Sequence, residues 1–286
     1  MGISLQFVCL CPRMKKLLLP IWLTLGLITT VQGQTIVKGH VVNELGDGVE
    51  YVSIGFEEDS VGVISDAKGN FSITIPAGRK KELSFSHVSY LTTEIPYQEY
   101  AKGEELTVVL KERVVELTEV VIGKKNKPKT IVGHGVLVPG GVVAISGRGL
   151  ADGPEGGPTF SCSKSYVISD ILLKVSGMSY KQCTLSVNIY EKQGKQFVNI
   201  HQKPIYEIIK QETGNHTLDI RPEENIVLKP KTDYYLSIAV VDSEGSGYLY
   251  IKGGMKNGLY RNAVKGKTKK LPICPAIQVK GYVVEE

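Results

Sequence analysis

Short runs of alternating apolar and polar residues, separated by turn-forming residues, fill the chain from 36 to 122. The stretch "SDAKGNFSITIP" at 65–76 is representative, because Phe71, Ile73 and Ile75 alternate with polar residues. A period of two places one face of a β-strand against a core and the other face in solvent. About seven such runs, with no helical period between them, predict a small antiparallel β-sandwich.

The cluster of Asp66, Gly69 and Asn70 in that stretch is either a turn or part of a calcium loop. A calcium loop needs about six to eight oxygen ligands, so the acids at 57–59 would have to fold over it. A turn needs only a carboxylate that accepts backbone hydrogen bonds and a glycine with positive φ. We therefore expect a structural corner, with Phe71 entering the core.

The same region resembles the carboxypeptidase-like regulatory domain, a transthyretin-like β-sandwich. The matching motifs are Gly39 and Val41, the turn Gly46 to Val49, Ser65-Asp66 with Gly69 and Phe71, and Leu83 to Ser86 followed by Tyr90. The chain departs from the family pattern with Ser65 for threonine, Glu50 in the turn, and Ser89 where glycine is usual. The resemblance implies a non-peptidase accessory domain here, because no peptidase motif accompanies it.

The segment "ELTEVVIGKK" at 116–125 resembles the stretch that follows this domain in SusC-like TonB-dependent outer-membrane receptors. In those receptors the stretch leads to a plug and a barrel. The remaining chain is too short for such a barrel, so we reject a transporter.

The stretch "MKKLLLPIWLTLGLITTVQG", which begins at Met14, has the form of a secretory signal peptide. Two lysines precede an apolar core, and small residues precede the expected cleavage site. We predict a signal peptide over 1–33, a true start at Met14 and a mature chain that begins at Gln34. Its apolar core is too short for a stable transmembrane helix, and no later segment is apolar enough for one. The protein is expected to be exported through the inner membrane, to the periplasm or to the outer membrane and cell surface.

The domain prediction that follows is a carboxypeptidase-like regulatory β-sandwich at 34–122, a basic linker at 123–130 and a C-terminal β-sandwich at 131–286. The Gly- and Pro-rich stretch before Phe160 is expected to form turns and edge strands. Later strands have the spacing of a jelly roll. This half resembles the poorly characterised C-terminal β-domain of exported Bacteroidetes-type proteins, through "EGGPTF", "VNIYE", "IVLKPKTDYYLSI" and "YRNA". The expected fold is all-β, with two sandwiches, the second jelly-roll-like.

Cys162, Cys183 and Cys274 are the cysteines left after signal removal. An oxidising compartment permits a Cys162–Cys183 disulfide with one free thiol. The alternative, which we favour, is that all three are small buried apolar side chains.

Nothing in the sequence predicts catalysis, a cofactor or a metal. The five histidines are scattered, without the spacing of a zinc set. Ser161 and Lys164 have the Ser-x-x-Lys spacing of penicillin-recognising enzymes, but that motif requires a helix and this stretch opens a strand. The formal net charge of +5 falls to about +2 once Arg13, Lys15 and Lys16 are removed, and this balance gives no reason to expect nucleic acid.

Binding is the remaining expectation. Tyr248, Tyr250, Asn257, Tyr260 and Arg261 are the candidate ligand-binding residues, because aromatic faces with amide and charged donors suit sugars. The alternative is that the tyrosines only cover an edge of the sandwich. The lack of tryptophan after the signal peptide argues against a strong sugar platform.

We therefore predict a non-catalytic, exported cell-envelope protein that acts as a binding or assembly module, with a glycan or an envelope protein as partner. One alternative is a purely structural surface component. The other is a glycan-processing enzyme, which would need two acids about 5–10 Å apart in a pocket.

Overall fold

A computed structural model describes residues 34–56, 61–114, 127–147, 154–194, 196–211, 214–261 and 268–284. Residues Thr35–Glu286 form one compact unit, distinct from Met1–Gln34. The predicted signal peptide, the acids at 57–59 and the first half of the predicted linker lie outside the described residues. Within the described ranges, no helix is long and apolar enough to cross a membrane.

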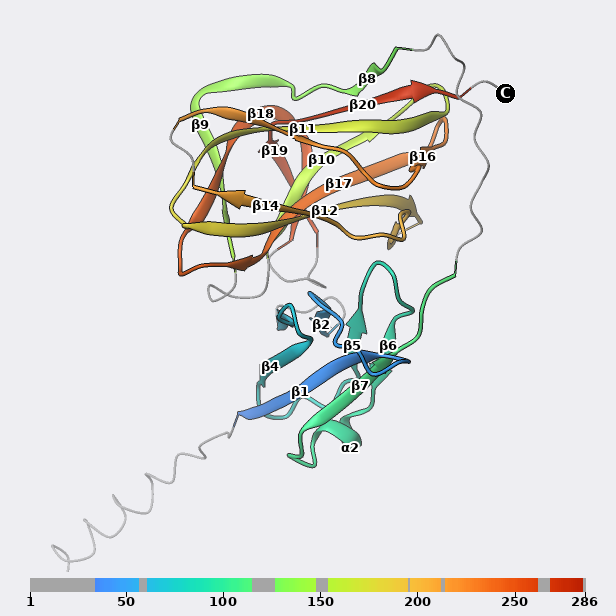
Figure 1. Cartoon of the computed structure of the whole chain (residues 1–286), viewed down its shortest axis with the longest axis vertical. Helices are drawn as coiled ribbons and strands as arrows, with labels where there is room; N and C mark the ends of the chain where they lie inside the picture. The colour runs from blue at the N-terminus through green and yellow to red at the C-terminus, as the bar shows by residue number, and fades with distance from the viewer. Residues whose placement is uncertain are drawn as a thin grey trace, which may run out of the picture. The chain divides into compact units, whose positions relative to one another are not determined.

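The first domain is a sandwich of two small sheets, ordered β4-β1-β7 and β3-β2-β5-β6 (Figure 1). Its elements are β1 (Thr35–Asn43), β2 (Ser53–Gly55), β3 (Gly62–Ile64), β4 (Asn70–Ile75), β5 (Leu83–Ser86), β6 (Thr93–Ile95), α2 (Tyr97–Tyr100) and β7 (Leu106–Leu110). Alternate residues of β4 are buried, as the pattern predicts. They pack in one core with Val41, Ile54 and Phe85.

One pairing differs from the predicted antiparallel sandwich. β1 pairs with β4 antiparallel, but it pairs with β7 in parallel. Period-two patterning fixes which face of a strand is buried and carries no information on strand direction. Gly39 lies in β1, where an added Cβ would come within 2.0 Å of the carbonyl oxygen of Leu106 in β7. The glycine of the first-strand motif therefore permits this close parallel pairing.

The Asp66 corner has the structure that the sequence predicts. Oδ1 of Asp66 accepts hydrogen bonds from the backbone N–H groups of Lys68, at 2.9 Å, and Asn70, at 2.8 Å. Gly69 has φ of +86°, and Phe71 is buried in the core. The prediction of a structural corner is confirmed.

The second domain is one large sheet that curves around its own core (Figure 1). Its main path runs β13-β12-β17-β10-β18-β11-β20-β8, and β9, β14, β15, β16 and β19 pair onto it. The strands are β8 (Lys129–Val132), β9 (Val136–Ser146), β10 (Glu155–Ser161), β11 (Tyr166–Met178), β12 (Gln182–Gln193), β13 (Gln196–Asn199), β14 (Ile205–Lys210), β15 (His216–Ile220), β16 (Val227–Leu228), β17 (Asp233–Ser243), β18 (Tyr248–Arg261), β19 (Lys269–Pro275) and β20 (Ile277–Val283). The all-β prediction is confirmed.

The Gly- and Pro-rich stretch is more regular than predicted. β9 pairs with β18 alone, as an edge strand would, but β10 lies inside the sheet between β17 and β18. A Cβ on Gly157 in β10 would lie 2.1 Å from the carbonyl oxygen of Leu236 in β17. The prediction of an edge was wrong for β10, because these glycines serve close strand approach and not chain reversal.

Cys162, Cys183 and Cys274 are buried free thiols. Burial raises the pKa of the Cys183 and Cys274 thiols to about 11. The structure therefore has the three buried side chains that we favoured, without the Cys162–Cys183 disulfide.

Candidate functional site

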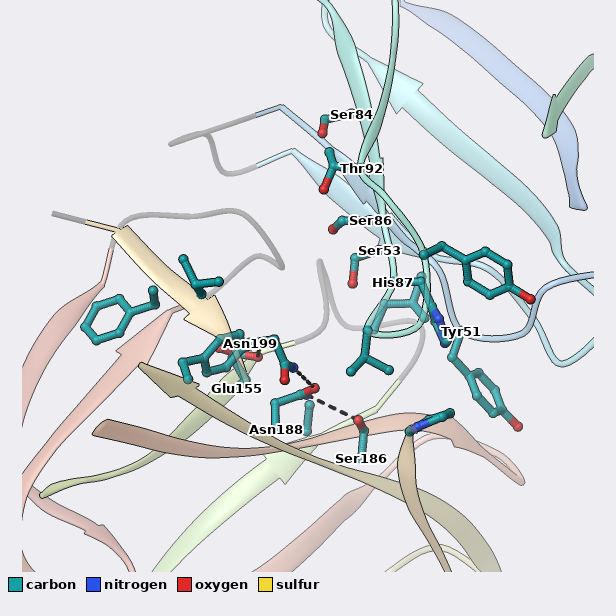
Figure 2. A pocket seen from close by; sticks show the side chains of 18 of the residues that line it. Tyr51, Ser53, Ser84, Ser86, His87, Thr92, Glu155, Ser186, Asn188 and Asn199 are labelled. Carbon is teal, nitrogen blue, oxygen red and sulfur yellow. Dashed lines mark hydrogen bonds between the residues drawn. The ribbon is translucent and has the colours of Figure 1, made fainter. Parts of the chain in front are cut away.

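A polar cleft of about 1270 Å³ is the candidate site (Figure 2). Its walls come from both sandwiches of the compact unit 35–286. On one wall, Ser53, Ser84, Ser86 and Thr92 supply hydroxyl groups, and on the other Ser186, Asn188 and Asn199 supply hydroxyl and amide groups. Donors and acceptors therefore line both sides of the cleft.

The hydroxyl row of the first domain follows from strand register. Ser53 of β2 lies opposite Ser86 of β5, and Ser84 lies opposite Gly55. Residues two apart on a strand share a face, so Ser84 and Ser86 point to the same side. Their neighbours Leu83 and Phe85 fill the core on the other face.

The amide row of the second domain is held by its own hydrogen bonds. Asn188 donates from Nδ2 to Oγ of Ser186 at 3.3 Å, and Asn199 donates from Nδ2 to Oδ1 of Asn188 at 3.1 Å. The backbone N–H of His201 donates to Oδ1 of Asn199 at 3.1 Å. The two bonds between side chains are drawn as dashed lines in Figure 2, and together with the bond from His201 they fix the orientation of Asn188 and Asn199.

Glu155 and Arg261 form an ion pair at the same wall. They lie opposite each other on β10 and β18, and Nε of Arg261 is 2.6 Å from Oε1 of Glu155. Their side chains are only 6% and 19% exposed. Burial by itself lowers the pKa of Arg261, but the adjacent Glu155 carboxylate outweighs it and raises that pKa overall. The two side chains are therefore held together at the wall of the cleft.

Tyr190 completes this cluster from β12. Its hydroxyl lies 3.2 Å from Nη2 of Arg261 and 3.5 Å from Oε2 of Glu155. Its ring stacks on that of Tyr235, with centroids 5.7 Å apart. Burial, and then the charge of Glu155, raise the pKa of Tyr190, so its hydroxyl stays protonated. Phe197 of β13 also lines the cleft and packs edge-on against Tyr235 at 5.5 Å.

Direct contacts join the two domains beside the cleft. Arg113 donates to the carbonyl oxygens of Asn199 and His201, and Oγ of Ser89 donates to that of Gln202 at 2.6 Å. The ring of Tyr51 meets the ring of Tyr206 edge-on at 5.0 Å. The loop that follows β13 and Tyr206 of β14 therefore both contact the first domain.

The sequence-predicted ligand residues are not gathered at one place. Arg261 lines the cleft, whereas Tyr248 and Tyr250 begin the same strand, with ring centroids 6.1 Å apart. Thirteen residues of extended strand span roughly 40 Å, so the two ends of β18 cannot contact one small ligand. Asn257 is exposed and Tyr260 is half-buried, and neither lines the cleft. A ligand role for these four stays a prediction.

Sequence reasoning missed Glu155, Asn188, Tyr190 and Asn199. The polar residues Ser186, Asn188 and Tyr190 alternate with apolar ones in β12, which was a usable signal for one polar face. Glu155 carried no local signal, since only strand pairing brings it to Arg261.

Within the described ranges, no group of three or more His, Cys, Asp or Glu side chains has the geometry to hold a metal ion. The cleft instead offers hydroxyls, amides, aromatic rings and charged groups of both signs, which are the Glu155–Arg261 pair and Lys80, Lys81, Glu82, Glu94 and Arg113. Such groups suit a polar ligand or a protein surface.

These features define a two-domain all-β protein with a polar cleft between its sandwiches. Residues 37–122 match the CarboxypepD_reg-like domain family, which confirms the resemblance for the first domain. No curated protein matches the chain. Among solved structures, the chain is similar to that of infectious bursal disease virus Gx strain, with 11% identity and a TM-score of 0.28. It is also similar to that of the VP2 subviral particle of infectious bursal disease virus, with 10% identity and a TM-score of 0.23. Each match covers 88% of this chain and 80% of the other. TM-scores this low do not support a common fold or function.

Proposed function

We propose that this protein is an exported, non-catalytic binding module of the cell envelope and that it binds a glycan in the polar cleft. The observation that carries the proposal is the pair of facing rows, Ser53, Ser84 and Ser86 against Ser186, Asn188 and Asn199. Sugars present hydroxyl groups that both donate and accept, and serine and asparagine side chains do the same.

Aromatic groups support the same ligand. Phe197 lines the cleft, and the apolar faces of sugar rings pack against aromatic side chains. The ring of Tyr190 is already in contact with Tyr235 and Arg261, so Tyr190 offers its hydroxyl group only. The Glu155–Arg261 pair adds directional hydrogen bonding without net charge. The cleft is therefore suited to a sugar chain that offers many hydroxyl groups.

A binding role is favoured over glycan processing by the contacts of Glu155. Glycoside hydrolysis requires one carboxyl group that gives up a proton and a second that stays ionised. Oε1 of Glu155 is instead engaged by Arg261 at 2.6 Å and its Oε2 lies near the Tyr190 hydroxyl, so neither oxygen of this carboxylate is free to act on a ligand. Glycan cleavage by the purified protein would establish the enzyme in place of the binding module.

Export is part of the proposal. It rests on the two lysines, the apolar core and the small residues before the expected cleavage site within residues 1–33. Location in the periplasm or at the outer membrane is also part of the proposal and rests on the same signal peptide. The similarity of 131–286 to the C-terminal domain of exported Bacteroidetes-type proteins is also part of the proposal and rests on the motifs of that half of the chain. N-terminal sequencing of the protein recovered from fractionated cells should begin at Gln34. Recovery of an uncleaved chain would overturn export by this route.

A partner protein is the second candidate ligand. Within the described residues, β7 pairs only with β1, so its other edge is open to strand addition from a partner. Assembly by strand addition does not require a ligand in the cleft. A purely structural surface component requires neither a ligand in the cleft nor a partner strand at the edge of β7.

The test is a binding screen of the protein against soluble polysaccharides and peptidoglycan fragments, followed by calorimetry. Asn188→Ala and Asn199→Ala should each weaken binding about tenfold, because each removes a preset hydrogen-bonding group. Asn257→Ala is the matched control, since this exposed amide lies outside the cleft. If Asn257→Ala weakens binding and Asn188→Ala does not, the binding site is on the exposed surface around Asn257, outside the cleft. Absence of glycan binding would favour the protein partner.

A further inference from the structure

Two histidines lie at the contact between the two sandwiches. His201, in the loop that follows β13, is only 1% exposed, and its backbone carbonyl accepts a hydrogen bond from Nη2 of Arg113 in the first domain. His87, which follows β5, is partly buried, and its Nε2 lies 3.3 Å from the hydroxyl of Tyr206 in the second domain. We call His87, Arg113, His201 and Tyr206 the junction.

The hydrogen bonds of both histidine rings require the uncharged form. Nδ1 of His201 lies 2.8 Å from the backbone carbonyl oxygen of Lys203, so Nδ1 carries the ring proton and Nε2 is the basic nitrogen. The backbone N–H of Ser89 donates to Nδ1 of His87 at 3.2 Å, so Nε2 of His87 carries the proton and donates to Tyr206. A second proton on His87 would therefore break the bond from Ser89.

A second proton on His201 would have no acceptor. Nε2 of His201 is buried and has no hydrogen-bond partner among the residues that the structure describes. Glu224 faces the ring, but its Oε1 lies 4.0 Å from Nδ1, on the other side of the ring from Nε2. That oxygen already accepts hydrogen bonds from the backbone N–H groups of Gln202 and Lys203. Burial therefore lowers the pKa of His201 more than the charge of Glu224 raises it.

Arg113 adds a fixed positive charge beside both rings. Its charge lowers the pKa of His87 and of His201, and His201 also lowers the pKa of His87. Arg113 holds the domains together as well, because it donates to the backbone carbonyl oxygens of Asn199 and His201. Protonation of both histidines would therefore bring three positive charges together at the contact that joins the domains.

The other titratable groups around the junction do not compensate these charges. The rings of Tyr90 and His87 are 5.4 Å apart, and burial raises the pKa of Tyr90 and of Tyr206, so both hydroxyl groups stay neutral in acid. Glu50 faces Tyr206, and burial raises its pKa, so it loses its charge early as the pH decreases. The side chain of Lys203 is exposed and pairs with Glu223 at 3.8 Å.

We propose that the junction is an acid-sensitive contact. In mild acid His87 and His201 take up protons, the contacts between the domains are lost, and the two sandwiches move apart while each stays folded. The cleft lies between the same sandwiches, so its walls separate in the same step. Contacts between domains of one chain open readily when they are polar and small. The proposal requires no ligand and is independent of glycan binding.

The direction of the effect follows from proton uptake. The closed junction lowers the pKa of His87 to about 4, whereas an exposed histidine titrates near 6.5. Between these values the open form binds more protons, so the closed form becomes less stable as the pH decreases. Through His87 alone, the ratio of closed to open molecules should decrease about 70-fold between pH 7.5 and 4.5. His201 acts in the same direction, since its pKa is also lowered.

Small-angle X-ray scattering of the protein without ligand tests the proposal. The radius of gyration should increase between about pH 7.5 and about pH 4, while the far-ultraviolet circular dichroism of the strands is retained. The double variant His87→Gln with His201→Asn should stay compact, because neither new side chain titrates. The glutamine can still reach Tyr206, and the asparagine can still donate to the carbonyl of Lys203. His40→Gln is the matched control, since His40 lies beside Asn70 on β1 and is outside the junction, so this variant should expand as the unaltered protein does.

Three outcomes would overturn the proposal. The first is a radius of gyration that does not change in acid. The second is loss of the strand signal together with the expansion, which would mean that acid unfolds the domains and does not separate them. The third is equal expansion of the double variant and His40→Gln. Thermal unfolding at pH 7.5 shows whether the double variant is folded. If it is not, the single variant His201→Asn should move the midpoint of the expansion to lower pH, and an unchanged midpoint would also overturn the proposal.

Discussion

Nε of Arg261 lies 2.6 Å from Oε1 of Glu155, across the β10–β18 pair, with both side chains largely buried. The two residues meet only because β10 pairs with β18, and each charge compensates the other. A buried pair of this kind is costly to break, because the remaining partner keeps its charge without compensation.

Arg261→Ala should therefore destabilise the protein by about 3–5 kcal/mol, measured as the free energy of unfolding in urea. The double variant Glu155→Gln with Arg261→Met should recover much of the loss, since no unpaired charge remains. Arg221→Ala is the control, because Arg221 pairs with Asp170 and Asp219 at an exposed site and should matter little. A loss for Arg261→Ala no greater than for Arg221→Ala would contradict the buried-pair interpretation.

Gly69 and Gly78 allow the Asp66 corner to be tested with a matched pair of substitutions. Both have positive φ, +86° and +78°, so alanine is strained at either position by about 1 kcal/mol. At Gly69 the new Cβ would also lie 2.3 Å from the carbonyl oxygen of Val41, whereas at Gly78 nothing lies within 4 Å. Gly69→Ala should cost about 2 kcal/mol more than Gly78→Ala in urea unfolding. Equal costs would show that the corner moves without resistance.

Stability should decrease as the pH falls from about 6.5 to about 4. Burial, then the charges of His201 and Arg113, lower the pKa of His87 to about 4, whereas an unfolded histidine titrates near 6.5. Between these values the unfolded chain binds more protons than the folded chain does. The free energy of unfolding therefore decreases as the pH decreases. Burial also lowers the pKa of His201, which acts in the same direction.

Urea unfolding at pH 7.5 and 4.5 should differ by on the order of 2 kcal/mol through His87. His87→Gln should reduce that difference, since its side chain does not titrate, while it can still reach the hydroxyl of Tyr206, which lies 3.3 Å from Nε2 of His87. An unchanged pH dependence in His87→Gln would mean that other groups are responsible.

The three thiols of the chain from Gln34 onward should react slowly with Ellman's reagent while the protein is folded. Their burial removes access, and at neutral pH the raised pKa of Cys183 and Cys274 leaves almost no thiolate. Denaturation without a reductant should expose all three. Only one reactive thiol in the denatured chain would reveal a Cys162–Cys183 disulfide instead.

The sequence by itself determined the local structure of this protein. Alternation in β4 predicted which side chains enter the core, and Asp66 with Gly69 predicted the turn before it, because both depend only on residues near in the chain. The spaced motifs of 37–122 were sufficient to indicate the CarboxypepD_reg-like domain.

Tertiary structure alone decided the rest. The parallel pairing of β1 with β7 and the interior place of β10 depend on which distant strands meet, and residue alternation is the same for either choice. The cleft has the same origin. Asn188 and Asn199 are joined by a hydrogen bond between their side chains, Glu155 meets Arg261 across 106 residues of chain, and Ser86 faces the site from another domain. Only Arg261, among the residues proposed from sequence, lines the cleft, because a strand as long as β18 carries its two ends to different parts of the molecule.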